Sequence, residues 1–264
     1  MRKVGRWGCI GLLFLLMLGT VGCHYTYPSA KVPDLIDAPD EERIDPKAPE
    51  FEGWFSTALE GSQEASRFWY SGWVASYVGR RQINLMVDGI VMRPEGYVAN
   101  TRIAGNALKM IRWNEEKFRD ERGRWYHDGF AQDELAPFGS FDRWTALTPH
   151  LTRAATGNVL GVASWVYEFS VPFVKWQALF PEAAVQDPNA LPPYGIDDGS
   201  VTVTMWLAQE EPVVQQFEVD YEVPLPAAGM LRQEIFFRFY RYGDPGMEPV
   251  DVEAIRNYLL EEAD

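Results

Sequence analysis

The stretch VVQQFEVDYEV, residues 213–223, alternates apolar and polar side chains almost without a break. Successive side chains of a β-strand point to opposite faces, so this alternation predicts a strand with one buried and one solvated face. The segments VTVTMWL (201–207) and LRQEIFFRF (231–239) lie on either side and have the same pattern. Three such strands joined by short connections predict part of an antiparallel sheet.

The first half of the chain predicts a second group of strands joined by brief turns. They are expected at Arg67–Val78, Gln82–Met92, Tyr97–Ala104, Ala107–Trp113, Glu115–Arg119 and Arg124–His127. Gly105-Asn106 is typical of a tight hairpin turn, and residues 121–123 form another. This half therefore predicts an antiparallel meander. One more strand is expected in the middle of the chain, at Val159–Ser170.

Four segments have helical periodicity. They are Phe51–Leu59 with a stop at Gly61, a short helix after Ser140 that Pro149 interrupts, Phe173–Phe180, and a last helix capped by Asp251 with Val252, Ile255 and Leu259 inward. Strands with one wet and one dry face need helices to cover the dry face. The predicted class is α+β, a curved antiparallel sheet with helices packed on one side.

The N-terminal segment predicts export. Arg2, Lys3 and Arg6 precede a short apolar run, Ile10–Leu18, which is the layout of a signal peptide. The run is too short to cross a hydrocarbon core of about 30 Å, which takes roughly 20 residues. The sequence TVGC at 20–23 resembles a bacterial lipobox, in which cleavage precedes a cysteine that receives acyl chains. The alternative is an ordinary signal peptide in which Cys23 occurs by chance.

These features predict three parts: a lipoprotein signal peptide at 1–22, lipidated Cys23 with a disordered tether to residue 49, and one domain at 50–264. The only other cysteine, Cys9, lies in the predicted signal peptide, so no internal disulfide or zinc cluster is expected. The predicted mature chain has 21 Lys/Arg against 38 Asp/Glu. This negative charge argues against nucleic acid as a partner. The expected location is extracytoplasmic, anchored to a membrane through Cys23.

Three segments carry a family resemblance: YSGWV (70–74), VDGIVMRPEGYVAN (87–100) and DERGRWYHDG (120–129). They resemble the first half of the LolA/LppX superfamily of lipid-handling proteins. The matching residues of its Gly–hydrophobic–(Arg/Lys)-Pro turn and its later Gly-x-Trp/Tyr hairpin are Gly89, Arg93, Pro94, Tyr97, Gly123, Trp125 and Tyr126. The resemblance covers most of residues 51–264. The C-terminal helix is an addition that the family does not need.

The resemblance implies a half-barrel of strands with helices on its concave side and an apolar cavity for acyl chains between them. The residues expected to line this cavity are Ile83, Leu85, Val87, Val91, Trp165, Phe217, Val219, Phe237 and Phe239. The high aromatic content, 14%, fits either a lined cavity or a solidly packed core. The sequence alone leaves both alternatives open.

Motifs for catalysis, metals or cofactors are not evident in the sequence. The three histidines, His24, His127 and His150, lack a second His or a Cys at metal-ligand spacing. Acidic residues cluster at Asp128, Asp133, Glu134 and Asp142, and again at Asp197-Asp198. A chain with 38 acidic residues is expected to contain such clusters by chance. We therefore expect no enzyme activity, no cofactor and no dedicated metal site.

Two functional hypotheses follow, with a third kept as a contrast. The first is a lipid-anchored protein that binds or carries a lipid or a lipidated partner in its cavity. The second is a cell-envelope or spore-envelope lipoprotein that keeps the fold but regulates or binds a protein partner without cargo. The third, a carbohydrate-active enzyme, would need two carboxylates roughly 5–9.5 Å apart in one cleft.

Overall fold

The computed structural model describes residues 49–264, with gaps at 80, 104–105, 115, 128–140, 181–198, 226–228, 245, 247–250 and 262–264. Cys23 and the predicted signal peptide lie outside the described residues, as does the predicted tether up to residue 48. The acidic pair Asp197-Asp198 and three members of the first acidic cluster, Asp128, Asp133 and Glu134, also lie outside them. The division into three parts therefore stays a prediction.

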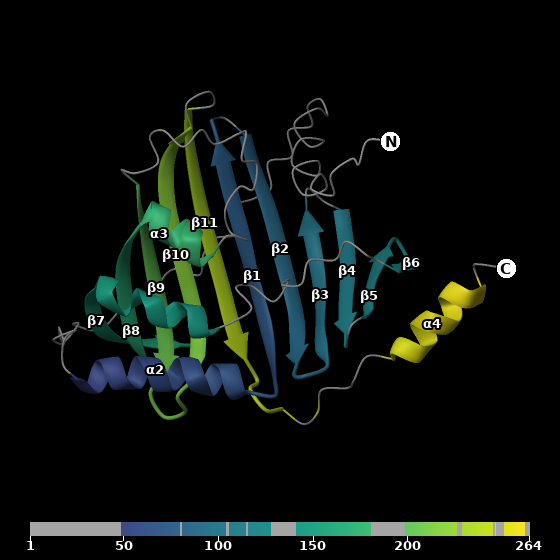
Figure 1. Ribbon diagram of the computed structural model, residues 1–264, viewed down its shortest axis with the longest axis horizontal. Coiled ribbons are helices and arrows are strands. Elements are labelled where there is room, and N and C mark those ends of the chain that lie inside the picture. Colours follow the sequence, from purple (N-terminus) through teal and green to yellow (C-terminus); the bar gives the residue numbers. More distant parts are fainter. Residues whose placement is uncertain are drawn as a thin grey trace, which may run out of the picture.

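The described strands form one curved antiparallel sheet, in the order β6-β5-β4-β3-β2-β1-β11-β10-β9-β8-β7 (Figure 1). The meander consists of β1 (Arg67–Val78), β2 (Arg81–Met92), β3 (Gly96–Ile103), β4 (Asn106–Trp113), β5 (Glu116–Glu121) and β6 (Arg124–His127). The second group consists of β7 (Leu151–Val159), β8 (Val162–Pro172), β9 (Ser200–Ala208), β10 (Val214–Leu225) and β11 (Gly229–Tyr240). The two groups meet where β1 pairs with β11.

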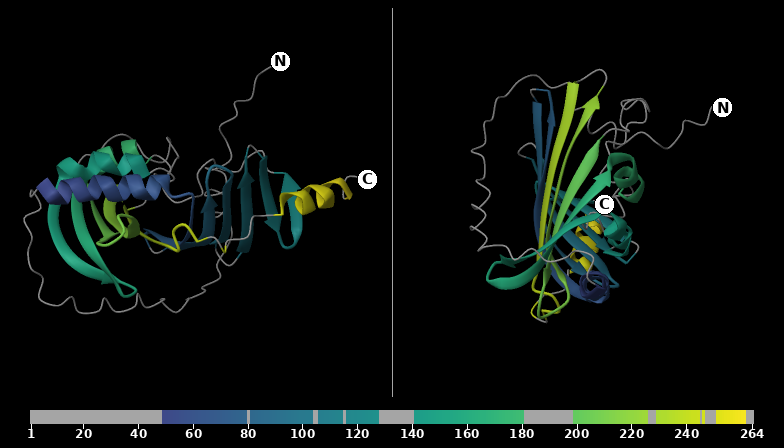
Figure 2. Two further views of the ribbon diagram at one scale, coloured as in Figure 1. Left: turned by 90° about the horizontal axis from the view of Figure 1, so that it is seen from below. Right: turned by 90° about the vertical axis from the view of Figure 1, so that its left-hand side faces the viewer.

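Helices lie at both ends of this sheet (Figure 2). α2 (Pro49–Glu64), the 3₁₀ helix η1 (Phe141–His150) and α3 (Phe173–Leu179) lie over the β7–β11 end, whereas α4 (Val252–Glu261) lies beside β5 and β6. The predicted fold class, α+β with a curved antiparallel sheet, is confirmed. Residues of α2, η1 and α3 pack in one core, as predicted, whereas those of α4 pack in a separate core.

The two ends of the sheet bury opposite faces. We call the face under α2, η1 and α3 the inner face, and its buried residues the inner core; Val91 and Tyr97 belong to it. Their chain neighbours Met92 and Val98 point the other way, to the outer face. The residues of this smaller outer core are Met92, Val98, Ile111, Phe118, Val252 and Ile255. The last two come from α4, so α4 covers the outer face.

The C-terminal helix begins as expected. The backbone N–H of Ala254 donates to Oδ1 of Asp251 at 2.9 Å, which satisfies one of the free donors of the first turn. Val252 and Ile255 are each 6% exposed, and Leu259 packs against the outer core. What the periodicity does not predict is the face of the sheet on which this helix packs.

Strand β7 differs from the prediction, which starts a single strand at Val159. Residues 151–159 instead form β7, and a turn at Leu160-Gly161 leads into β8. Both turn residues have positive φ, 52° and 89°, and the N–H of Gly161 donates to Oδ1 of Asn158 at 2.7 Å. The sequence TRAATGN has little apolar alternation because β7 is an edge strand with several exposed side chains. The Asn–x–x–Gly turn was the available signal.

Gly61 does not stop α2, which continues to Glu64. A Cβ at Gly61 would lie 2.3 Å from the carbonyl oxygen of Pro212, so glycine is needed for close approach of the helix to the β9–β10 connection. One residue later, Oγ of Ser62 accepts a hydrogen bond from the N–H of Val214 at 2.7 Å. This end of α2 is therefore held against backbone.

A bulge in β10 shifts the predicted register at its start. Pairing with β9 jumps between Val214 and Gln216, so two residues oppose one at this point. Val214, and not Val213, consequently joins the inner core. From Phe217 onward the alternation is as predicted.

Arg93, in the turn matched by the family resemblance, caps α2. Its guanidinium Nη1 donates to the carbonyl oxygens of Ser62 (2.9 Å), Ala65 (3.3 Å) and Gln63. The last turn of α2 contains no basic residue of its own, so Arg93 supplies the positive charge that a helix C-terminus favours. The same guanidinium lies 5.3 Å from the ring centroid of Phe68. The turn thereby ties the meander to the helix that covers the other end.

Candidate functional site

All nine residues predicted to line a cavity lie on the inner face. Strand register places Val87 opposite Gly72, Gly72 opposite Phe237, and Phe237 opposite Phe217. Leu85 and Val219 belong to the next row, on either side of Val74 and Ile235. The prediction that these side chains share one face is thus reproduced by the pairing. Their role as a ligand site stays a prediction.

Under η1 the inner face is filled by aromatic rings. The ring of Trp144 lies 4.8 Å from that of Phe217, which in turn lies 5.4 Å from Phe237 and 5.7 Å from Phe239. Phe237 also fills the space that a side chain at Gly72 would need, because a Cβ there would lie 2.3 Å from its ring. At this end the predicted lining residues form a packed core.

The nine residues differ in exposure along the sheet. Val87, Val91, Phe217, Val219, Phe237 and Phe239 are 0–6% exposed. Ile83 and Leu85, near the beginning of β2, are only partly buried, and Trp165 on β8 is also partly exposed. The apolar inner face therefore extends along β2 beyond the fully buried core.

A row of polar side chains crosses the inner face next to Ile83. Nε2 of Gln233 donates to Oγ of Ser76 at 2.8 Å, and the Tyr221 hydroxyl donates to Oε1 of Gln233. These three side chains are 2–7% exposed, and burial raises the pKa of Tyr221 above its usual range. Sequence reasoning missed this row. The available signal was Gln233, a polar residue on the apolar parity of β11.

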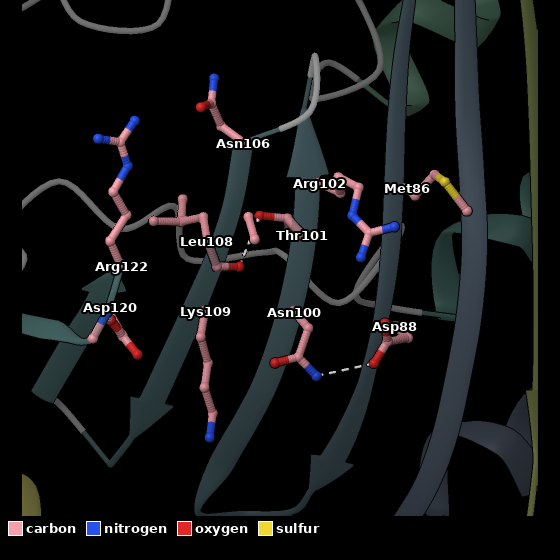
Figure 3. Close-up of a pocket in the computed structure, with 12 residues that line it drawn as sticks. Met86, Asp88, Asn100, Thr101, Arg102, Asn106, Leu108, Lys109, Asp120 and Arg122 are labelled. Carbon is pink, nitrogen blue, oxygen red and sulfur yellow. Dashed lines mark hydrogen bonds between the residues drawn. The ribbon is translucent and has the colours of Figure 1, made fainter. Parts of the chain in front are cut away.

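A second feature, a hollow of about 630 Å³, lies at the opposite end of the sheet. Most of its lining residues, such as Asp88, Asn100 and Lys109, have outer-face parity (Figure 3). The complete lining is Met86, Asp88, Asn100, Thr101, Arg102, Asn106, Ala107, Leu108, Lys109, Asp120, Arg122 and Gly123. It includes none of the nine predicted residues.

The described residues contain no group of three or more His, Cys, Asp or Glu side chains placed to hold a metal ion. His127 packs edge-on against Phe118, with ring centroids 5.6 Å apart. Burial, together with the nearby charge of Lys175, lowers the pKa of His150. Within the same described residues, no helix is long and apolar enough to span a bilayer.

An open curved antiparallel sheet with helices on its inner face is the architecture of LolA-like proteins. LprF from Mycobacterium bovis aligns with a TM-score of 0.51 and 12% sequence identity, over 77% of this chain and 97% of LprF. This chain therefore has a LolA-like fold of the LppX/LprG type, as the sequence resemblance implied.

Two further solved structures align less closely. Lipoprotein LppX from Mycobacterium tuberculosis gives a TM-score of 0.48 and 13% identity over 75% of this chain and 98% of LppX. A LolA superfamily protein from Nitrosomonas europaea gives 0.30 and 6% over 77% and 96% of the two chains. The sequence matches no protein-family model and no curated protein.

Proposed function

We propose that this protein is a lipid-anchored extracytoplasmic lipoprotein that binds a lipid, or the acyl chains of a lipidated partner, on the inner face of its sheet. The observation that carries the proposal is the apolar inner face, which continues onto the partly exposed Ile83 and Leu85. The sequence resemblance to lipid-handling proteins and the lipobox-like TVGC at 20–23 support it.

The inner face offers an amphiphilic ligand two environments. Leu85 lies opposite Val74. These two apolar side chains would pack against acyl chains. The neighbouring row contains Ser76 and Gln233, whose hydroxyl and amide groups suit a neutral ester, amide or hydroxyl. An acyl chain lying along β2 would thus have a polar group near its end.

Binding is tested by native mass spectrometry of the full chain and by displacement of a fluorescent fatty acid. Leu85→Trp should fill the inner face and lower the affinity for the fluorescent acid without unfolding the protein. Asn84→Trp adds the same side chain to the outer face of the same strand, so it should bind like the wild type. If the wild type neither retains nor takes up an acyl ligand, or if Leu85→Trp binds normally, the proposal is wrong.

Anchoring is tested separately with Cys23→Ala. Loss of the acyl chains should release the folded protein from carbonate-washed membranes, because the tether contains no apolar face. Retention of this variant would indicate that an uncleaved signal segment holds the protein in the membrane.

A second candidate function is a lipoprotein without cargo that binds an envelope protein. The contacts of Phe217 with Trp144, Phe237 and Phe239 favour it, since they fill the space under η1. Under this alternative, Leu85→Trp would have no ligand to displace, and the wild type would never be found with an acyl ligand.

A further inference from the structure

A row of side chains crosses the outer face of the sheet and changes from aromatic at one end to polar toward the other. Strand register aligns Phe236, Trp73 and Met86, and continues through Arg102 to Ala107. The row therefore begins with two aromatic rings at the centre of the sheet and ends in the hollow of Figure 3.

The two rings form a partly exposed aromatic pair, which we call the platform. The rings of Trp73 and Phe236 are stacked, with centroids 6.1 Å apart and an interplanar angle of 15°. Both side chains are partly exposed, and Met86, beside Trp73, is 51% exposed. Arg238 lies over Phe236 at 5.3 Å from its ring centroid, so its guanidinium helps to fix that ring and covers part of it.

The hollow is lined by one small side chain of this row together with longer ones. Exposed Ala107 is one of its lining residues, and the long side chains of Met86, Arg102 and Arg122 line it as well (Figure 3). A second row runs beside the first, in which Asp88, Asn100, Lys109 and Asp120 lie on successive strands. The amide of Asn100 donates to Oδ2 of Asp88 at 2.9 Å.

The hollow contains donors and acceptors in similar number. Asp88 and Asp120 provide acceptors, Arg102, Lys109 and Arg122 provide donors, and two asparagine amides provide both. An anion would meet the two carboxylates and a cation the three basic groups, so neither is favoured. A neutral ligand with many hydroxyl groups can use both kinds of partner.

We infer that this outer face binds an oligosaccharide, with one sugar ring against the Trp73–Phe236 platform and another, further along the glycan, in the hollow. A sugar ring presents C–H groups on its flat face, which pack on aromatic π-systems, and hydroxyl groups at its edge. The hollow, at about 630 Å³, has the volume of ordinary small-ligand sites, about 300–1,000 Å³. The site is separate from the lipid site proposed above, because it lies on the other face.

The geometry indicates binding rather than hydrolysis. Asp88 and Asp120 lie on β2 and β5, so three strand spacings of about 4.8 Å put them about 14 Å apart. Glycosidases need two carboxyl groups within roughly 5–9.5 Å. We therefore expect the glycan to dissociate from the protein without being hydrolysed.

The test measures binding of chitotetraose and cellotetraose to the full chain, in a detergent without a sugar headgroup, by saturation-transfer NMR and calorimetry. Ala107→Trp should fill the hollow and weaken binding at least about tenfold, equivalent to roughly 1.4 kcal/mol. Thr202→Trp, on the outer face of β9, adds the same side chain elsewhere and should leave affinity unchanged. Both sites are exposed, so both variants should keep the wild-type melting temperature.

A second variant keeps the hollow's shape. Asp120→Asn retains the Oδ1 that accepts the N–H of Gly123 at 2.7 Å but removes the charge, and should also weaken binding. The proposal is overturned if neither oligosaccharide binds the wild type, if Ala107→Trp binds as well as Thr202→Trp, or if inorganic phosphate displaces the sugar. None of these results depends on acyl ligands, so the lipid-binding proposal is tested independently.

Discussion

The covered end of the sheet, β7 to β11, and the far end of the meander, β4 to β6, have the same antiparallel pairing but bury opposite faces, whereas β2 and β3 contribute to both cores. Three helices and a dense set of aromatic rings lie on the inner face at one end. At the other end, among the described residues, helix α4 lies on the outer face. The alternation of a strand therefore indicates how residues divide between the two faces, whereas the choice of buried face depends on where helices pack.

The largest expected effect compares one phenylalanine from each core. Phe217 and Phe118 are both fully buried. Phe217→Ala should lower the free energy of unfolding by about 3–5 kcal/mol, because rings on several sides hold the cavity open. Phe118→Ala should cost less, since α4 can move into the space. Urea denaturation of both variants measures the difference, and equal losses would contradict a distinction between the two cores.

The next prediction concerns the link between the two ends. Arg93→Ala should lower the free energy of unfolding by about 1.5–3 kcal/mol, because three carbonyl oxygens at the C-terminal end of α2 and just after it lose a charged donor. Amide hydrogen exchange should speed up first at the C-terminal end of α2. Arg112→Ala on β4 serves as a control for loss of a positive charge. A uniform increase in exchange over the whole sheet would argue against a role as a helix cap.

A smaller effect is expected at the close approach of α2. Gly61→Ala should destabilise the protein by about 1–3 kcal/mol, because its Cβ would overlap the carbonyl of Pro212. Gly53→Ala, in the same helix with nothing within 4 Å, should instead stabilise it by about 0.5–1 kcal/mol. Thermal denaturation of the pair gives the two signs, and a stabilised Gly61→Ala would contradict the contact.

The smallest effect is a pH dependence confined to the meander end. The hydrogen bond from Arg256 lowers the pKa of Glu116, so the folded state holds this proton less tightly than the unfolded one. The resulting stability is present above the unfolded pKa, near 4.3, and is lost as the pH falls toward the folded pKa. The difference in melting temperature between wild type and Glu116→Gln should therefore shrink from about pH 7 to about pH 3. When Arg256→Gln is already present, adding Glu116→Gln should change the melting temperature by an amount that does not vary with pH.

Much of the strand order could be predicted because it depends on local patterns. β1 and β6 have the predicted bounds, and β9, β11 and the part of β10 from Phe217 onward follow the alternation from which they were inferred. β7 was missed because an edge strand needs little apolar alternation. The role of Gly61 was missed because glycine marks both helix ends and close contacts, and only the position of Pro212 distinguishes them.

The site was less accessible from sequence. Parity correctly grouped Val87, Phe217 and Phe237 on one face, since their strands alternate cleanly. It could not indicate that Trp144 packs on Phe217, because that contact depends on the path of η1. The outer hollow needs the register of four strands to bring Asp88 and Asp120 into one row, and register is set by long-range pairing.

The pairing of β1 with β11 also governs how the chain is completed during synthesis. Tyr70 in β1 can pair with Phe239 only after β11 has been synthesised. The outer core can be completed only after α4 has been synthesised. Contacts between distant parts of a sequence form slowly, because the entropy of closing the intervening chain is lost first. Until then β1 has an unpaired edge and the meander an uncovered apolar surface, the two features that make nascent chains aggregate. The interval between the emergence of these two strands is therefore when the chain is most open to aggregation and proteolysis.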